Sequence, residues 1–164
     1  MLGNLKGMVM TFLTSLRTPV TAQYPDARMP VEERRMGFPM LLWDDNIVEP
    51  YCTGCMVCVR ECPTQCMSAT MKDNPKHGEG LSHRRKIIDV FEINIGRCIL
   101  CGICVDVCNF DAIEMSYETE LSTRTRNGRR MELGELLERG FSWQAQSGWV
   151  PVSQREQNSQ EQGQ

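Results

Sequence analysis

The 164-residue sequence has no long hydrophobic run and no excess of basic residues. None of its apolar stretches approaches the roughly 18 residues that a membrane-spanning helix needs. Its 18 basic and 21 acidic residues give a formal net charge of −3, which argues against a nucleic-acid-binding surface. The N-terminal stretch also lacks the basic and long apolar segments of a signal peptide, so we expect the mature chain to begin near Met1.

Motifs of substrate chemistry are missing as well. The sequence contains no Ser/His/Asp arrangement, no P-loop and no dinucleotide-binding glycine fingerprint. The C-x3-C-x2-C spacing of radical SAM enzymes is also absent. Apolar residues make up 41% of the chain, which allows one small domain with extensions. We therefore expect no catalytic residues and no directly bound small-molecule substrate.

Nine cysteines are the unusual feature of the composition, and their odd number excludes complete pairing as disulfides. Eight of them form two runs with the spacing C-x2-C-x2-C-x3-C, at residues 52–62 and 98–108. Structural zinc sites usually use pairs of C-x2-C separated by a longer gap, which fits these runs poorly. The spacing is that of bacterial ferredoxins with two [4Fe–4S] clusters, in which the fourth cysteine of each run binds the other cluster.

This pattern predicts the ligands of both clusters. The first cluster takes three cysteines of the first run and one of the second, namely Cys52, Cys55, Cys58 and Cys108. The second cluster takes the reciprocal set, namely Cys98, Cys101, Cys104 and Cys62. Because each cluster draws a ligand from the other run, folding and cluster assembly should be coupled.

The two runs belong to an internal repeat with an offset of 46 residues, which predicts a pseudo-twofold core at residues 47–116. Strands are expected to lead into the runs at residues 47–51 and 87–95, with partner strands following at 66–71 and 112–116. The expected fold is therefore α+β, with a bacterial-type dicluster ferredoxin core. We expect dry aliphatic packing inside it, from Val57, Val59, Ile87, Ile93, Ile99, Ile103, Val105 and Ile113.

Two segments precede this core. Residues 1–17 have helical periodicity with one apolar face. We expect this face to pack on the domain or a partner subunit, to lie at a membrane interface, or to do both. Residues 18–46 are rich in proline and charge, and predict an irregular, extended arm.

Two further segments follow the core. Residues 117–140 are predicted to form a C-terminal extension with a short amphipathic helix at 131–139, ended by Gly140. Residues 141–164 are predicted to be a low-complexity tail without fixed structure. A polar loop at 72–86 joins the two repeats.

Two positions depart from the repeat. Cys66 corresponds to Ala112, which favours a small buried residue over a role in cluster chemistry. Asn109 stands where the first run has Pro63, so it is either neutral turn variation or a source of one more backbone N–H for a cluster sulfur.

The remaining polar residues carry weaker signals. His77 and His83 are expected at the solvated surface. The two basic clusters are expected to form solvated faces or subunit contacts, with acidic lipid head groups as the alternative. These clusters are Arg84, Arg85 and Lys86, and Arg124, Arg126, Arg129 and Arg130.

Three segments together resemble subunit I of NADH:quinone oxidoreductase, the respiratory complex I. They are the arm at residues 18–25, the second cysteine run with its flanks at 93–113, and residues 117–121. The first run, through Pro63 and Gln65, fits as well, and the resemblance covers roughly residues 1–140. Asn109, Cys66 and the glutamine-rich tail depart from the family pattern.

The resemblance implies an electron-relay subunit that passes electrons through two [4Fe–4S] clusters towards a cluster beside the quinone site. Its implied partners are other subunits of the peripheral and membrane arms, together with the membrane surface through the N-terminal helix. The implied location is the cytoplasmic face of a bacterial inner membrane. The alternatives are the equivalent subunit of a hydrogenase or ferredoxin-dependent membrane complex, a free ferredoxin, and a structural metal protein.

Overall fold

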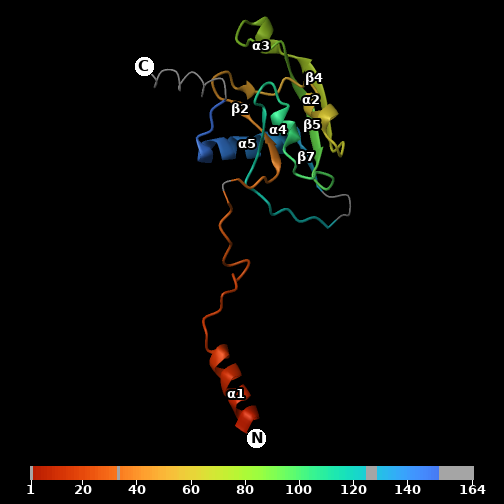
Figure 1. Ribbon diagram of the computed structural model, residues 1–164. Coiled ribbons are helices and arrows are strands. Elements are labelled where there is room, and N and C mark those ends of the chain that lie inside the picture. Colours follow the sequence, from red (N-terminus) through yellow and green to blue (C-terminus); the bar gives the residue numbers. More distant parts are fainter. Residues whose placement is uncertain (1, 33, 125–128, 152–164) are drawn as a thin grey trace, which may run out of the picture. The chain divides into compact units, whose positions relative to one another are not determined.

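A computed structural model describes residues 2–32, 34–124 and 129–151 of the chain (Figure 1). The chain divides into two compact units, Met1–Glu33 and Arg34–Gln164. Among the described residues, no helix combines the length and the apolar character that crossing a membrane requires.

The first unit contains the predicted helix, α1 (Leu2–Ser15). Hydroxyl groups on it donate to the backbone of the preceding turn, from Thr11 to the Met8 carbonyl at 2.9 Å and from Thr14 to the Met10 carbonyl at 2.8 Å. None of its residues is buried. Its exposed large apolar side chains are Leu2, Leu5, Met8, Val9, Met10, Phe12 and Leu13. Residues 18–32 contain neither helix nor strand, as their prolines predict.

The second unit combines small antiparallel sheets with short helices. The strand pairs are β1 (Pro39–Leu41) with β6 (Ile113–Met115), and β2 (Trp43–Asp44) with β3 (Glu49–Pro50). A third sheet has β5 (Lys86–Asn94) between β4 (Met67–Asp73) and β7 (Arg130–Glu132). The helices are α2 (Val57–Glu61), α3 (Pro75–Gly78), α4 (Ile103–Asp106) and α5 (Leu133–Ser147). Figure 1 shows α5, in blue, below α2 and α4, the two helices that belong to the cysteine runs.

Strands β4, β5 and β6 form where the sequence predicts them. Strand β3 lies within the predicted first strand at 47–51, but it pairs with β2, and the strand that pairs with β6 is β1. Met67 pairs with Ile93, five residues before Cys98, whereas Ile113 pairs with Leu41, eleven residues before Cys52. The extra residues form the β2–β3 hairpin. The prediction of an extended arm is therefore wrong for residues 37–46, because the apolar segment from Phe38 to Leu42 is buried and pairs with β6.

Helix α5 begins two residues later than predicted and continues past Gly140 to Ser147. Gly140 does not end it, because this glycine is the point of closest approach to β1. A Cβ atom at Gly140 would lie 1.7 Å from the Leu41 carbonyl oxygen. Gly148 ends the helix instead, with φ at 62°. The predicted tail is therefore helical at 141–147, and residues 152–164 lie outside the described part of the chain.

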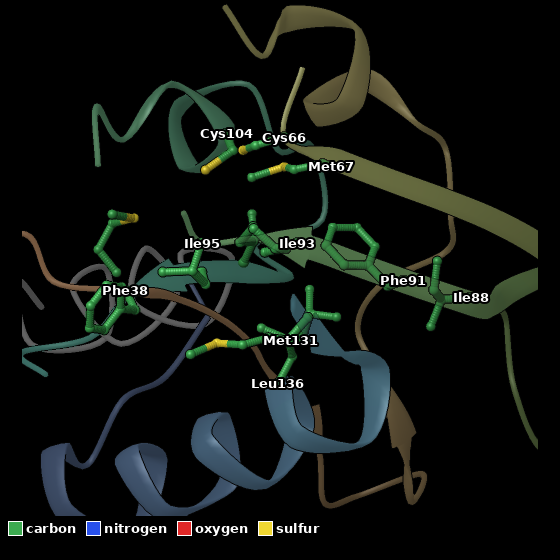
Figure 2. Packing of buried hydrophobic residues seen from close by; sticks show 13 residues of the cluster. Phe38, Cys66, Met67, Ile88, Phe91, Ile93, Ile95, Cys104, Met131 and Leu136 are labelled. Atoms are coloured by element: carbon green, nitrogen blue, oxygen red, sulfur yellow. The ribbon is translucent and has the colours of Figure 1, made fainter. Parts of the chain in front are cut away.

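The hydrophobic core lies along β5, between the cysteine runs and α5. Figure 2 shows Ile93 at its centre, with Cys66 and Cys104 on one side and Met131 and Leu136 on the other. Of the predicted core residues, Ile93 and Ile113 are buried, and Val59 and Val105 pack against the core.

Two of the predicted core residues are exposed instead. The exposed fractions are 61% for Ile99 and 36% for Ile103. The buried position in α4 is taken by Cys104, which is 8% exposed, so the neighbouring isoleucine is turned outwards. The predicted dry aliphatic interior is therefore wrong at these two positions.

A buried ionic network corrects the expectation for the polar loop. Arg84 contacts Asp44 at 2.8 Å and Glu49 at 2.7 Å, and all three side chains are buried. Asn74 and Ser82 also donate to the Glu49 carboxylate, at 2.9 and 2.6 Å. Burial raises the pKa of Glu49, but these hydrogen bonds outweigh burial and hold the pKa below its ordinary value. The prediction of a solvated Arg84 is therefore wrong, because the loop is anchored to the β2–β3 hairpin.

The other polar predictions need little change. His77 and His83 are exposed, as predicted. Among the basic residues, Arg85, Lys86, Arg124, Arg129 and Arg130 are exposed, whereas Arg126 lies outside the described residues.

Candidate functional site

The eight cysteines of the two runs line two cavities in the second unit. The first cavity has an empty volume of about 390 Å³, and its cysteines are Cys52, Cys55, Cys58 and Cys108. The second cavity has an empty volume of about 310 Å³, and the run cysteines that line it are Cys62, Cys98, Cys101 and Cys104. Each cavity thus brings together one of the two predicted sets of four.

The backbone winds in the same way around both cavities. Three residues in or just after each run adopt positive φ, which is uncommon for residues other than glycine and marks a left-handed turn. These turns reverse the chain between cysteines, so that residues three apart can face one cavity. The pairs, each separated by the repeat offset, are Gly54 and Leu100, Met56 and Gly102, and Gln65 and Asp111.

Short helices carry the chain from one cavity to the other. Cys58 lies in α2 and lines the first cavity, while Cys62 follows that helix and lines the second. Cys104 lies in α4 and lines the second cavity, while Cys108 follows and lines the first. Helices α2 and α4 contact each other. The two cavities are therefore linked twice by the chain.

Burial disfavours free thiolates at several of these positions. It raises the pKa of Cys52 and Cys104 to about 12 and that of Cys58 to about 11, and nearby cysteines add to the effect. Thiolates at such positions need a bound cation to compensate their charge.

The donor set fits [4Fe–4S] clusters, in which four thiolates each bind one iron at a corner of the cube. No three His, Cys, Asp or Glu side chains within the described ranges converge closely enough to hold a single metal ion. The four cysteines instead surround a cavity in both cases.

Cys62 differs from the other cysteines in its hydrogen bonds. Its Sγ lies 3.5 Å from the Thr64 hydroxyl and 3.5 Å from the Cys66 Sγ. Burial raises the pKa of Cys62, but hydrogen bonds from residues 64 and 66 outweigh it and lower the pKa to about 7. Cys108 is the equivalent cysteine of the second run, and its Sγ accepts a hydrogen bond from the backbone N–H of Ala112 at 3.3 Å.

Sequence reasoning found one of these neighbours and missed the other. Cys66 is 5% exposed, which confirms the predicted buried position. Thr64 was missed. Its position two residues after a predicted ligand, where the second repeat has Phe110, could have indicated a hydroxyl next to the Cys62 sulfur. The predicted N–H contact of Asn109 stays a prediction.

Comparison with known proteins agrees with this geometry. Residues 51–112 match the family of 4Fe-4S dicluster domains. Over 121 residues the chain is 39% identical to NADH-quinone oxidoreductase subunit I 2 of Streptomyces coelicolor, covering 72% of this chain and 58% of that protein. It is 30% identical to NADH-quinone oxidoreductase subunit I 2 of Geobacter metallireducens, covering 82% of this chain and 96% of that protein.

A chain of the membrane-bound sulfane sulfur reductase, an archaeal respiratory membrane complex, has a TM-score of 0.46 and 24% identity. That match covers 71% of this chain and 54% of the other.

The fold and the site therefore define a protein with two [4Fe–4S] clusters. The chain belongs to the family of NADH-quinone oxidoreductase subunit I proteins. It spans a little over half the length of the Streptomyces relative.

Proposed function

We propose that this chain is an electron-relay subunit of a membrane-bound NADH:quinone oxidoreductase. Its two [4Fe–4S] clusters pass electrons towards a cluster beside the quinone site of a neighbouring subunit. The observation that carries the proposal is the sorting of eight cysteines into two sets of four around two linked cavities. Family membership supports the choice of NADH as electron donor, of a quinone-site cluster as acceptor, and of a proton-translocating complex as the enzyme.

In this proposal the first cluster binds to Cys52, Cys55, Cys58 and Cys108, and the second to Cys98, Cys101, Cys104 and Cys62. The repeated left-handed turns support a pseudo-twofold relation between the two halves. Each cluster supplies one-electron redox chemistry when bound. The chain's own residues hold the thiolates, and the apolar core along β5 limits the access of water from one side.

We also propose that the subunit is peripheral, on the cytoplasmic face of a bacterial inner membrane, with other subunits of the peripheral and membrane arms as partners. Helix α1 would lie along the membrane interface or against a partner subunit. The apolar side chains that α1 leaves exposed support both positions.

The test is the native size of the iron-bearing species in mild-detergent extracts of membranes, with reduction by NADH followed by EPR in the same fraction. We expect a particle of several hundred kilodaltons with signals that NADH reduces. A large particle that NADH does not reduce would point to a related membrane complex with another donor. A soluble species near 19 kDa would overturn the proposal.

Deletion of residues 1–17 tests the role of α1. We expect both clusters to remain, because these residues line neither cavity, and we expect less of the chain in the membrane complex. Iron content and blue-native electrophoresis measure the two effects. Normal membrane retention and quinone reductase activity would contradict a docking role.

A further inference from the structure

The cysteines that cross between the runs, Cys62 and Cys108, occupy equivalent positions but have different neighbours. The Thr64 hydroxyl and the Cys66 thiol both lie 3.5 Å from the Cys62 Sγ. The equivalent residues beside Cys108 are Phe110 and Ala112, whose side chains have no hydrogen-bond donor. The two halves of the repeat thus differ by two side-chain donors at one sulfur.

Cluster binding fixes the direction of these hydrogen bonds. A cysteine bound to iron is a thiolate without a proton, so the Cys62 sulfur can only accept. The Thr64 hydroxyl and the Cys66 thiol must then donate. Hydrogen bonds to the sulfurs of an iron–sulfur cluster are among the factors that set its potential, and they favour the reduced form because it carries one more negative charge.

Solvent exposure does not separate the two sets in the same way. In the second set Cys101 is exposed but Cys104 is buried, whereas all four cysteines of the first set are partly exposed. Water near a ligand stabilises the reduced cluster as a hydrogen bond does, so exposure ranks neither cluster above the other, and the difference between them lies in the hydrogen bonds to Cys62.

We propose that Thr64 and Cys66 raise the reduction potential of the second cluster above that of the first. This inference rests on the proposed function, because it requires that both clusters bind as assigned.

The experiment uses the full chain carrying both clusters, in an EPR-monitored redox titration. Thr64→Val and Cys66→Ala each remove one donor, while Thr64→Ser and Cys66→Ser keep a hydroxyl in its place. A Cys101→Ser variant identifies which signal belongs to the second cluster. Each donor-removing variant should lower the reduction potential of the second cluster. We expect the distribution of electrons between the clusters to change about tenfold in favour of the first, which corresponds to about 59 mV for one electron.

Iron and sulfide contents, measured first in the wild-type chain, separate failure of the proposed function from failure of this inference. Fewer than two clusters there, or signals that Cys101→Ser leaves unchanged, would count against the proposed function. With both clusters present, a lower potential for the second cluster only, rescued by the serine variants, would support the inference.

Three results would overturn the inference while leaving the proposed function intact. The first is that the potentials do not change in Thr64→Val and Cys66→Ala. The second is an equal shift of both clusters, or a loss of a cluster that only the serine variants prevent, because either result would make the two residues structural. The third is a wild-type second cluster with the lower potential.

Discussion

The two halves of the second unit share one backbone design but differ in how the rest of the chain uses it. Left-handed residues recur at the repeat offset in both halves, so ligand geometry is repeated closely. The strand that precedes the cysteines is not repeated: β5 leads almost directly into the second run, whereas β1 is separated from the first by the β2–β3 hairpin. Cluster binding constrains the loops, while the added segments are free to diverge.

The hairpin shows what that divergence adds. Its two strands supply Asp44 and Glu49, which hold Arg84 of the loop between the repeats. Tyr51, directly before the first run, has its ring 5.0 Å from the Arg84 guanidinium carbon. The insertion therefore connects the first run to the loop that joins both halves.

Loss of a ligand from one half should have the largest effect. Cys104→Ala is expected to prevent assembly of the second cluster, because this buried thiol is one of its four assigned ligands. The iron content should fall from eight to about four per chain, measured together with acid-labile sulfide. Cys66→Ala, at the same cavity, is the control that keeps both clusters. An unchanged iron content in Cys104→Ala would reject the ligand assignment.

The next largest effect should come from the buried ion pairs between Arg84 and the β2–β3 hairpin, a segment that the second half lacks. Arg84→Met leaves the carboxylates of Asp44 and Glu49 buried without their cation, which costs about 3–5 kcal/mol of unfolding free energy. The urea midpoint of the loaded protein measures this loss. Lys86 lies two residues after Arg84 and forms an exposed ion pair with Asp73. Lys86→Met removes that pair and should leave the urea midpoint close to that of the wild type. Equal effects of the two substitutions would contradict a special role for the buried network.

Helix α5, which has no counterpart after the first repeat, offers a matched pair of glycines. Gly140→Ala places a methyl group against the Leu41 carbonyl and is expected to destabilise the protein by about 1–3 kcal/mol or more. Gly134 lies in the same helix, and beyond that helix's own backbone a methyl group there would have no atom within 4 Å, so Gly134→Ala should stabilise by up to about 1 kcal/mol. Thermal unfolding of both variants measures the difference. A tolerated alanine at residue 140 would mean that the contact with β1 is not tight.

The cysteine runs could be predicted from the sequence, whereas the roles of Arg84 and Gly140 could not. The cysteine runs predicted both groupings because ligand spacing is a local constraint that a chain must satisfy wherever it folds. Arg84 was misassigned because its partners are 35 and 40 residues away and nothing nearby in the sequence indicates them. The role of Gly140 could not be predicted for the same reason, because the sequence does not distinguish a glycine that ends a helix from one that contacts a strand distant in the chain.

The smallest expected effect concerns the backbone turn that both halves share. Gly54 adopts φ of 75°, and its equivalent Leu100 adopts φ of 54° despite its side chain. A left-handed conformation costs a non-glycine residue about 1–2 kcal/mol, so Leu100→Gly should be more stable than Leu100→Ala by about 1 kcal/mol. The neighbouring exposed residue Ile99 is the control, because at an ordinary φ alanine should be more stable than glycine. Chemical denaturation of the four variants, with both clusters bound, gives the two differences. The same ranking at both positions would show that the second run does not need the turn that glycine provides in the first.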